Sequence, residues 1–505
     1  MSHSIVRQLN HIKKLLSALI SSKTQQTSPP NRVPFHLGVF LFIKGLGLCY
    51  LIAFASLWSQ LNGLYGSNGL LPIHENVAIL SKHLPFSALP SLFWINSSDL
   101  VLNAACIIGV LSGALLILGL APKVQLLISW ILYLSFVNTG QDFMHFQWDV
   151  LLLEIGFIAL FLCPFQWKQI KPGPYSGPIR FYLQFTLARL MISSGWVKLA
   201  SGDLSWRQLN ALNVHFETQP LPHWGSFFAH QLPDALLRFS TLIMFIIELI
   251  IPFLLFAPRT YRHIAVSLIG LLMILIGLTG NYGFFNLLVI VLALLCLDNR
   301  ILSPLHKSLI NNKPAIVQQN RHRILCGLGI FFSIILELNR FTPFQTPQLI
   351  KPMTQTLSQQ WHLVHTYGLF ANMTQTRFEI DIQGSMDGLT WKSYEFKFKP
   401  NALGHFPSWV QPHQPRLDWQ LWFAALRPFT PHSWMGRFLM ALLEGRPEVL
   451  ELLKSSPFEQ PPIYLRAHLY QYQFQSFSQW QENHQIWKRQ FVKVYCPTIR
   501  RASNK

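Results

Sequence analysis

Charged residues are scarce in this chain. Asp, Glu, Lys and Arg make up 12% of its 505 residues, whereas hydrophobic residues make up 50%. An ordinary soluble domain carries about 25% charged residues. The deficit is concentrated before residue 340, which excludes a purely soluble globular protein. It predicts an α-helical multi-pass membrane bundle followed by a soluble domain.

Cysteine and recognised catalytic motifs are also sparse. Of the six cysteines only Cys496 follows residue 340, which excludes an internal disulfide in that part of the chain. The absence of any CxxC pair excludes a zinc knuckle and a thioredoxin-like redox site. Neither a Gly-rich phosphate loop nor a GxSxG elbow occurs. We therefore predict no metal and no cofactor.

The first 34 residues lack the apolar core of a cleavable signal peptide. They are basic, with Arg7, Lys13, Lys14, Lys23 and Arg32. The stretch 9–20 fits either a short amphipathic helix on a membrane surface or a frayed tail.

Apolar runs that approach the roughly 20 residues needed to cross a bilayer recur up to residue 340. We predict about nine spans, near residues 35–58, 100–120, 124–138, 148–165, 181–200, 236–257, 263–280, 283–298 and 323–339. The third and fourth are short. The two spans at 263–280 and 283–298 are also short, and only residues 280–283 separate them.

The formal net charge is +19, and most of the basic residues that produce it lie in the loops between these runs. Lys and Arg gather in the N-terminal tail and near residues 168–180, 259–262 and 300–323, whereas loops 59–99, 139–147, 201–235 and 281–282 hold at most one each. This positive-inside pattern puts the N-terminus in the cytosol and the C-terminal end opposite. It predicts a lipid bilayer as partner, not nucleic acid. We expect a basic cytosolic tail (1–34), a polytopic domain (35–339) and a non-cytosolic domain (340–505).

Residues after 340 read as a β-rich α+β domain. Polar residues 377, 379, 381 and 383 alternate with Phe378, Ile380 and Ile382, which predicts a strand with one half-buried face. A turn at 385–388 closes a hairpin, and Tyr394, Phe396 and Phe398 repeat the alternation on its second strand. Residues 431–455 look helical, and 463–474 and 485–495 look like returning strands.

Ionisable groups among the predicted spans are costly unless paired, so they are candidates for function. His145 and Asp149 are four residues apart and would share a face of one helix. They form either a proton relay or a hydrogen-bonded clasp at the mouth of the bundle. Gln141, Trp148 and Glu154 lie in the same segment.

A second polar set lies in the span near 181–200 and just after it. Arg189 and Lys198 are nine residues apart, so they point in opposite directions and need separate partners. Lys198 pairs with a carboxylate such as Asp149 or Glu217, snorkels, or serves as a base. Asp203 and Trp206 follow directly.

A third set precedes two prolines. Pro220 and Pro222 favour extended backbone, in which His215, Glu217 and Gln219 would share a side. With His145 and Asp149 they form a conceivable two-histidine carboxylate metal site, but the spacing is not a known ligand signature.

Eight segments, in order, resemble the lipase maturation factor family: LNGLYGSNGLLP (61–72), GQDFMHFQWDVLLLE (140–154), RLMISSGWVKLASGDLSWRQLNALNVHFETQPLP (189–222), IELIIPFLLF (247–256), GNYGFFN (280–286), HTYGLFANMTQTRFEIDIQGSMDGLTWKSYEFKFKP (365–400), HQPRLDWQLWFAAL (413–426) and SPFEQPPIYLRAHLYQYQF (456–474). One departure is NALGHFPSW (401–409), where the family carries a more basic turn. The spans are also distantly similar to vitamin K-dependent carboxylase-like, horizontally transferred transmembrane proteins, with Lys198 at a related position.

The resemblance implies a membrane protein that assists folding and assembly of exported clients such as lipases. It implies the endoplasmic reticulum membrane in a eukaryote; a bacterial member would lie in the inner membrane. The alternative is a membrane enzyme that modifies a protein or lipid, with Lys198 as base. A transporter is a third hypothesis with little support in the spans. The residues expected to bind a client are Arg377, Glu379, Trp391, Asp418, Trp419 and Trp422, although Trp419 and Trp422 fit a core better. The family motifs also contain Gln141, Trp148, Glu154, Arg189, Asp203, Trp206, Gln219, Pro220 and Asn281.

Overall fold

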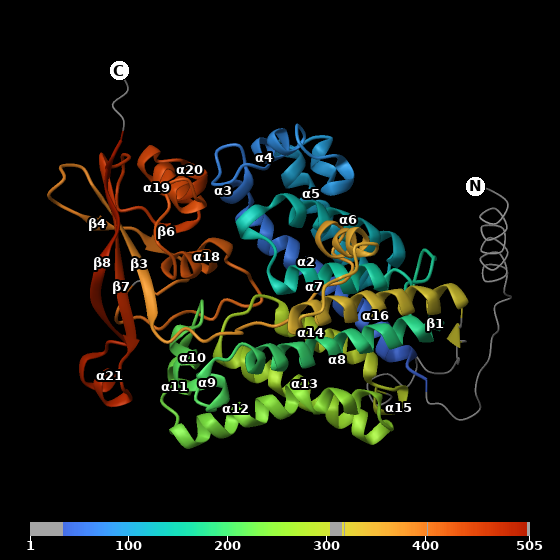
Figure 1. Ribbon diagram of the computed structural model, residues 1–505. Helices are drawn as coiled ribbons and strands as arrows, with labels where there is room; N and C mark the ends of the chain where they lie inside the picture. Colours follow the sequence, from blue (N-terminus) through green and yellow to red (C-terminus); the bar gives the residue numbers. More distant parts are fainter. Residues whose placement is uncertain (1–33, 303–315, 318, 401, 502–505) are drawn as a thin grey trace.

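The computed structural model describes residues 34–302, 316–317, 319–400 and 402–501, so the helix expected at 9–20 lies outside it. Helices fill most of the molecule, and a β-sheet stands at one end of them (Figure 1). Three of the C-terminal helices, α18, α19 and α20, lie between the sheet and the rest of the helices (Figure 1). The predicted class, a helical membrane protein with a C-terminal β-rich region, is therefore right in outline.

Helices dominate up to residue 341. They are α2 (His36–Trp58), α3 (Leu61–Tyr65), α4 (Ile73–Leu80), α5 (Asp99–Leu118), α6 (Pro122–Thr139), α7 (Gln147–Ala159), α8 (Gly177–Ala200), α9 (Leu204–Arg207), α10 (Leu212–Thr218), α11 (Trp224–His230), α12 (Asp234–Leu249), η4 (Ile251–Phe256), α13 (Arg259–Thr279), α14 (Phe285–Ala293), α15 (Asn299–Leu302) and α16 (Asn320–Phe341). Two short strands, β1 (Tyr175–Ser176) and β2 (Ile316–Val317), pair in parallel among them.

The predicted number of nine spans is not confirmed. A helix occurs in each of the nine predicted segments, but within the described residues five helical segments are long and apolar enough to cross a membrane: His36–Trp58, Asp99–Leu118, Asp234–Phe256, Arg259–Thr279 and Asn320–Phe341. The helix α7 has 13 residues, about 20 Å of rise, and most of them are buried in the bundle. The helix α8 is long but carries Arg180, Arg189 and Lys198. Apolar runs therefore mark buried helices as well as spans.

Glycines bring α2 and α5 into close contact. A Cβ on Gly113 of α5 would lie 2.7 Å from the Leu51 amide nitrogen and 2.9 Å from the Gly47 carbonyl oxygen of α2. A Cβ on Gly109 would enter the ring of Phe54. Small residues at helix contacts are a common packing device in membranes, where close backbone approach supplies the attraction.

The C-terminal part contains a four-stranded antiparallel sheet in the order β4-β3-β7-β8. Its strands are β3 (Arg377–Ser385), β4 (Lys392–Ser393), β7 (Tyr464–Phe474) and β8 (Trp487–Arg500), and β5 (Glu395–Phe396) pairs separately with β6 (Leu453–Ser455). The helices here are α17 (Lys351–Gln355), η8 (Thr356–Gln360), α18 (Arg416–Ala425), α19 (Trp434–Glu444), α20 (Pro447–Leu450) and α21 (Phe477–Asn483). The predicted strands at 377–383, 463–474 and 485–495 are confirmed, and the stretch 431–455 is helical apart from β6 at its end. The predicted second hairpin strand at 394–398 is wrong, because only Lys392 and Ser393 of β4 pair with β3 and the next strand, β5, pairs with β6.

The predicted turn at 385–388 is confirmed as well. The Asp387 carboxylate accepts hydrogen bonds from the amides of Leu389 and Thr390, each at 2.8 Å, and Gly388 adopts a positive φ of 78°. The expected single buried face of β3 is wrong at its start. Arg377 and Glu379, on the polar side, are buried: Arg377 donates to carbonyls of the loop after α10, and Glu379 pairs with Arg377 and Lys399.

Candidate functional site

The first cluster of buried charge joins α7 to α18. The Arg416 guanidinium donates two hydrogen bonds to Asp149, Nη1 to Oδ2 at 3.0 Å and Nη2 to Oδ1 at 2.9 Å. The Tyr133 hydroxyl donates to the same carboxylate at 2.5 Å, and Arg416 also donates to the Phe143 carbonyl. Both charged side chains are almost fully buried. Residues 267 positions apart thus form one bidentate pair.

The expected pairing of His145 with Asp149 on one helix is wrong. The helix α7 begins at Gln147, and His145 precedes it with φ of 67°, which lies in the left-handed region. Asp149 instead accepts the Phe146 amide at 3.2 Å, as a first-turn carboxylate does. The His145 ring lies 5.8 Å from that of His362, centroid to centroid.

The second cluster surrounds Glu154. Arg189 of α8 donates to Glu154 Oε1 and to the Ser333 hydroxyl of α16. Glu154 Oε2 accepts from the Tyr367 hydroxyl at 2.7 Å and from the His365 amide at 2.9 Å. The C-terminal part therefore supplies two hydrogen bonds to a carboxylate inside the helical part.

Lys198 is bonded to Glu248 of α12, not to Asp149 or Glu217. Its Nζ lies 2.9 and 2.7 Å from the two carboxylate oxygens and 3.0 Å from the Ser194 carbonyl oxygen. The prediction of separate partners for Arg189 and Lys198 is confirmed. An ammonium group that donates all three protons has no lone pair with which to act as a base.

His215 and Glu217 lie in the helix α10, so the predicted extended stretch is wrong. The constraint from Pro220 reaches only the residue before it, Gln219, which is extended with ψ of 156°. The two side chains consequently diverge. His215 Nε2 lies 3.0 Å from the Tyr282 hydroxyl, whereas Glu217 accepts the Phe474 amide at 2.6 Å.

The hydrogen bonds fix the tautomer of His215. The Tyr282 hydroxyl donates to Gln219 Oε1 at 2.8 Å, so it accepts from His215 Nε2–H. Nδ1 is then a buried acceptor, and it has no partner among the described residues. Burial, with a smaller contribution from Lys198, lowers the pKa of His215 to about 4, so the ring is neutral at neutral pH.

Two of the five candidate catalytic residues line one cavity. Lys198 and His215, together with Gln147 and Glu248, border a space of about 470 Å³ between α8, α10, α12 and α13. Its other walls are mostly apolar. His145, Asp149 and Glu217 lie outside it. Within the described residues, no three His, Cys, Asp or Glu side chains are placed to hold a metal ion.

The proposed client-binding residues lie mostly inside the molecule. Arg377 donates to the carbonyls of Glu217, Gln219 and Pro220 and pairs with Glu379. Asp418 accepts the amides of Phe398 and Lys399 at 3.0 and 2.9 Å. Burial raises the pKa of Asp418 to about 6.

The tryptophans proposed for client contact also have internal partners. Trp419 packs edge-on against Trp148 at 5.1 Å, and Trp422 donates to the Thr218 carbonyl at 2.8 Å. Both are core residues, as the sequence favoured. Trp391 is partly exposed under the guanidinium of Arg466, 4.0 Å from its ring.

The other motif residues mainly join segments. Asn281, in the turn between α13 and α14, donates to the carbonyls of Leu221 and Ser408 and accepts the Val410 amide. Asp203 accepts the amides of Ser205 and Met373, and Trp206 donates to the Phe370 carbonyl. Gln141, with φ of 45°, lies in the turn before α7.

Sequence reasoning missed several partners: Glu248, Arg416, Tyr367, His362 and His365. Glu248 had a detectable signal, because it is the sole carboxylate in the apolar run 236–257. Arg416 had none, since it lies in a polar segment far from Asp149 along the chain.

These features define a class: a multi-helix integral membrane protein whose C-terminal sheet region is attached to the helices by buried ion pairs and hydrogen bonds. The chain matches the lipase maturation factor transmembrane domain over residues 38–304 and the lipase maturation factor C-terminal domain over residues 363–497. It therefore belongs to the lipase maturation factor family.

Individual relatives agree with this assignment. The chain is 33% identical to mouse lipase maturation factor 2 and 32% identical to the human protein of that name, in both cases over 91% of this chain and 82% of the relative. It is 30% identical to bovine lipase maturation factor 1, over 87% of this chain and 84% of the relative. No solved structure matches.

Proposed function

We propose that this protein is a membrane-resident maturation factor, a chaperone that assists the folding and assembly of exported lipases and is not an enzyme. The names of its relatives support this role. The buried charged groups of Asp149, Glu154, Arg189 and Lys198 support it too, because each is held in an ion pair. In particular, Lys198 is bonded as a structural cation.

The observation that carries the proposal is the exposed edge strand β8. It has 14 residues at one edge of the sheet, and residues 488–494 are exposed on both faces. Phe491, Val492 and Val494 are 51%, 42% and 51% exposed. An open edge presents unpaired amides and carbonyls to which an extended segment of another chain can pair. We infer that an incompletely folded client segment docks here.

The positive charges of β8 determine which segments can pair with this edge. Lys488, Arg489 and Lys493 lie among the apolar side chains. They discourage pairing between two copies of β8 through like-charge repulsion, a known protection of edge strands. They favour client segments that carry Asp or Glu beside apolar residues.

We further propose the orientation and division of the chain. Residues 1–34 form a cytosolic tail, 35–339 the polytopic part and 340–505 a lumenal or periplasmic domain, in the endoplasmic reticulum membrane or in a bacterial inner membrane. Arg259 and Arg262 pair with Asp298, and Arg180 donates to the Leu295 carbonyl, so these basic loops gather at one end of the helices. The sheet lies at the other end (Figure 1). This separation supports the positive-inside reading.

The test compares two sets of variants in cells that secrete a co-expressed lipase and lack their own maturation factor. Phe491→Ser with Val494→Ser should abolish most secreted lipase activity at unchanged protein level, because the edge loses its apolar contacts. Leu389→Ser, on a turn at the opposite edge and 85% exposed, is the matched control and should have no effect.

The enzyme alternative has its own variant. Lys198→Met with Glu248→Gln removes both charges of the pair at once, so no buried charge is left alone. We expect this protein to keep most of its activity. A folded double variant without activity, together with an active β8 variant, would reject the proposal in favour of catalysis at Lys198.

A further inference from the structure

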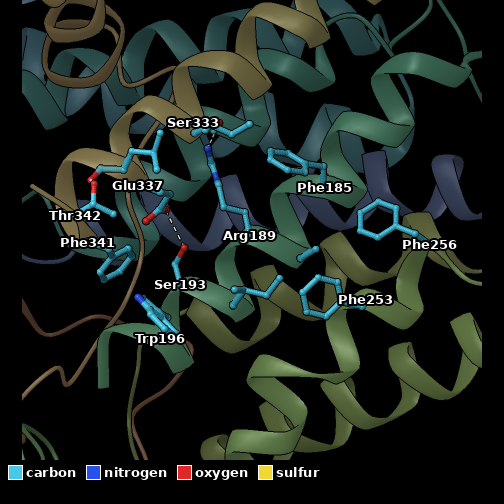
Figure 2. Close-up of a pocket in the computed structure, with 14 residues that line it drawn as sticks. Phe185, Arg189, Ser193, Trp196, Phe253, Phe256, Ser333, Glu337, Phe341 and Thr342 are labelled. Atoms are coloured by element: carbon cyan, nitrogen blue, oxygen red, sulfur yellow. Dashed lines mark hydrogen bonds between the residues drawn. The ribbon is translucent and has the colours of Figure 1, made fainter. Parts of the chain in front are cut away.

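A groove between α8, η4 and α16 contains a carboxylate without a counter-ion. The groove has a volume of about 400 Å³, and its lining is almost entirely apolar (Figure 2). Glu337 of α16 accepts the Ser193 hydroxyl at 2.8 Å through Oε1. Its Oε2 is buried and has no hydrogen-bond partner among the described residues.

The neighbouring cations are committed elsewhere. Arg189 donates to Glu154 and Ser333, and Arg340 donates to the Tyr367 carbonyl. Within the described part of the chain, Glu337 takes part in no ion pair. A carboxylate in a span is costly unless it is paired or neutral, so a cation from outside the protein would stabilise the ionised form of Glu337.

Two aromatic rings flank the carboxylate. Trp196 of α8 and Phe341 of α16 meet edge to face, with ring centroids 6.4 Å apart, beside Glu337 at one end of the groove (Figure 2). Aromatic faces next to a carboxylate are the usual recognition elements for an ammonium group, quaternary ammonium included. The site therefore fits a substituted ammonium better than a metal ion.

An apolar track leads away from this end. Phe185, Phe253 and Phe256 line the opposite end of the groove (Figure 2). Phe253 is 64% exposed, as expected of a ring that faces hydrocarbon. From Phe185 to Trp196 the helix α8 rises about 16 Å. That length is close to one leaflet of a hydrocarbon core about 30 Å thick.

The depth of the Glu337 carboxylate in the membrane matches the level of a lipid headgroup. Glu337 lies about one turn from the end of α16, a candidate span of 22 residues. The ammonium end of the groove is thus near the level of the headgroups, and the track runs from there toward the midplane.

We propose that this groove binds a phospholipid with an ammonium headgroup, ethanolamine or choline. The ammonium contacts Glu337 and the ring of Trp196, and one acyl chain lies along Phe185 and Phe253. This site is separate from the β8 edge, so it stands whether or not that edge binds clients.

Native mass spectrometry of the full chain tests this proposal. The protein is exchanged into micelles that contain equal amounts of phosphatidylcholine and phosphatidylglycerol with identical acyl chains. The wild type should retain phosphatidylcholine over phosphatidylglycerol by roughly tenfold, because the choline cation gains ionic and cation–π contacts that the neutral glycerol headgroup cannot make. Glu337→Gln keeps the shape and the Ser193 contact but should reduce the ratio to about threefold, the share that the aromatic ring of Trp196 supplies. Glu75→Gln, an exposed carboxylate on α4, is the control and should not change the ratio.

A second variant tests the proposal even if the Glu337→Gln protein does not fold. Trp196→Leu keeps the groove apolar but removes a ring, and it should lower the retention of phosphatidylcholine about threefold. Equal retention of the two lipids by the wild type would overturn the proposal. So would an undiminished preference in Glu337→Gln, or a basic peptide found in place of lipid.

Discussion

At the scale of single residues, the hydrogen-bond network assigns a charge state to the buried histidines. Asn138 donates to the carbonyls of Pro90 and Gln360, so its oxygen accepts from His362 Nε2 at 2.9 Å. His362 Nδ1 must then accept from His365 Nε2 at 2.8 Å. The His362 ring is neutral in this arrangement, and a second proton on it would face the N–H of His365.

These histidines make stability sensitive to acid. Burial lowers the pKa of His362 to about 2 and that of His365 to about 4, whereas an exposed histidine titrates near 6.5. The unfolded chain therefore binds more protons than the folded protein below pH 6.5. We expect the free energy of unfolding to fall from that pH toward the folded pKa values, by roughly 1 kcal/mol per pH unit for each histidine.

Thermal unfolding in detergent between pH 7 and pH 5 measures this slope, and His362→Gln should reduce it. Asp418 acts with the opposite sign. Burial raises its pKa to about 6, so the folded state binds the extra proton and gains stability as the pH falls from about 6 to 4. Asp418→Asn should consequently steepen the loss in acid. A wild-type unfolding temperature that rises on acidification, with His362→Gln unchanged, would contradict the assignment.

At the scale of elements, helix contact in this protein depends on where glycine occurs. Gly113 touches backbone atoms of the neighbouring helix α2, whereas Gly270 in α13 has no atom within 4 Å of its would-be Cβ. Glycine thus allows two helices to approach closely at position 113 but has no packing role at position 270. Burial explains the difference, since α5 packs against α2 and Gly270 is open on one side.

The two glycines allow one chemical change to be compared in two environments. Gly113→Ala should destabilise the protein by about 1–3 kcal/mol, because its methyl group meets backbone that only a shift of the helix can move. Gly270→Ala should be neutral or stabilise by up to about 1 kcal/mol through helix propensity. Unfolding temperatures of the two variants in one detergent decide the matter; equal effects would mean that the α2–α5 contact is looser than described.

At the scale of the whole molecule, sequence patterns predicted local structure far better than long-range pairing. The period-two stretch from Arg377 and the Asp387 turn were recoverable because strand and turn chemistry are local. The partners Asp149–Arg416 and Lys198–Glu248 were not, because contacts across 267 and 50 residues leave no periodic trace. The span count is not confirmed for a related reason, since hydropathy does not distinguish a lipid-facing helix from the buried α7.

The Asp149–Arg416 pair offers a test of how the two ends of the chain are held together. Arg416→Met should cost about 3–5 kcal/mol, because it leaves a buried carboxylate without its counter-charge. Adding Asp149→Leu should restore most of that loss. Arg437→Met, which breaks the exposed pair with Glu75, should cost about 1 kcal/mol or less.

The readout is the yield of monodisperse protein in detergent together with its unfolding temperature. If Arg416→Met and Arg437→Met behaved alike, the bidentate pair would not hold the C-terminal region to the helices.

The position of Arg416 in the chain also sets an order of events during synthesis. Asp149 and Glu154 emerge from the ribosome more than 200 residues before Tyr367 and Arg416, which complete their coordination. Until the last part of the chain has arrived, Asp149 lacks its counter-charge Arg416, and Glu154, which already has Arg189, lacks the hydrogen bonds from His365 and Tyr367. A prematurely ended chain would keep that deficit permanently. A finished molecule therefore differs from an unfinished one by the neutralised charge of Asp149.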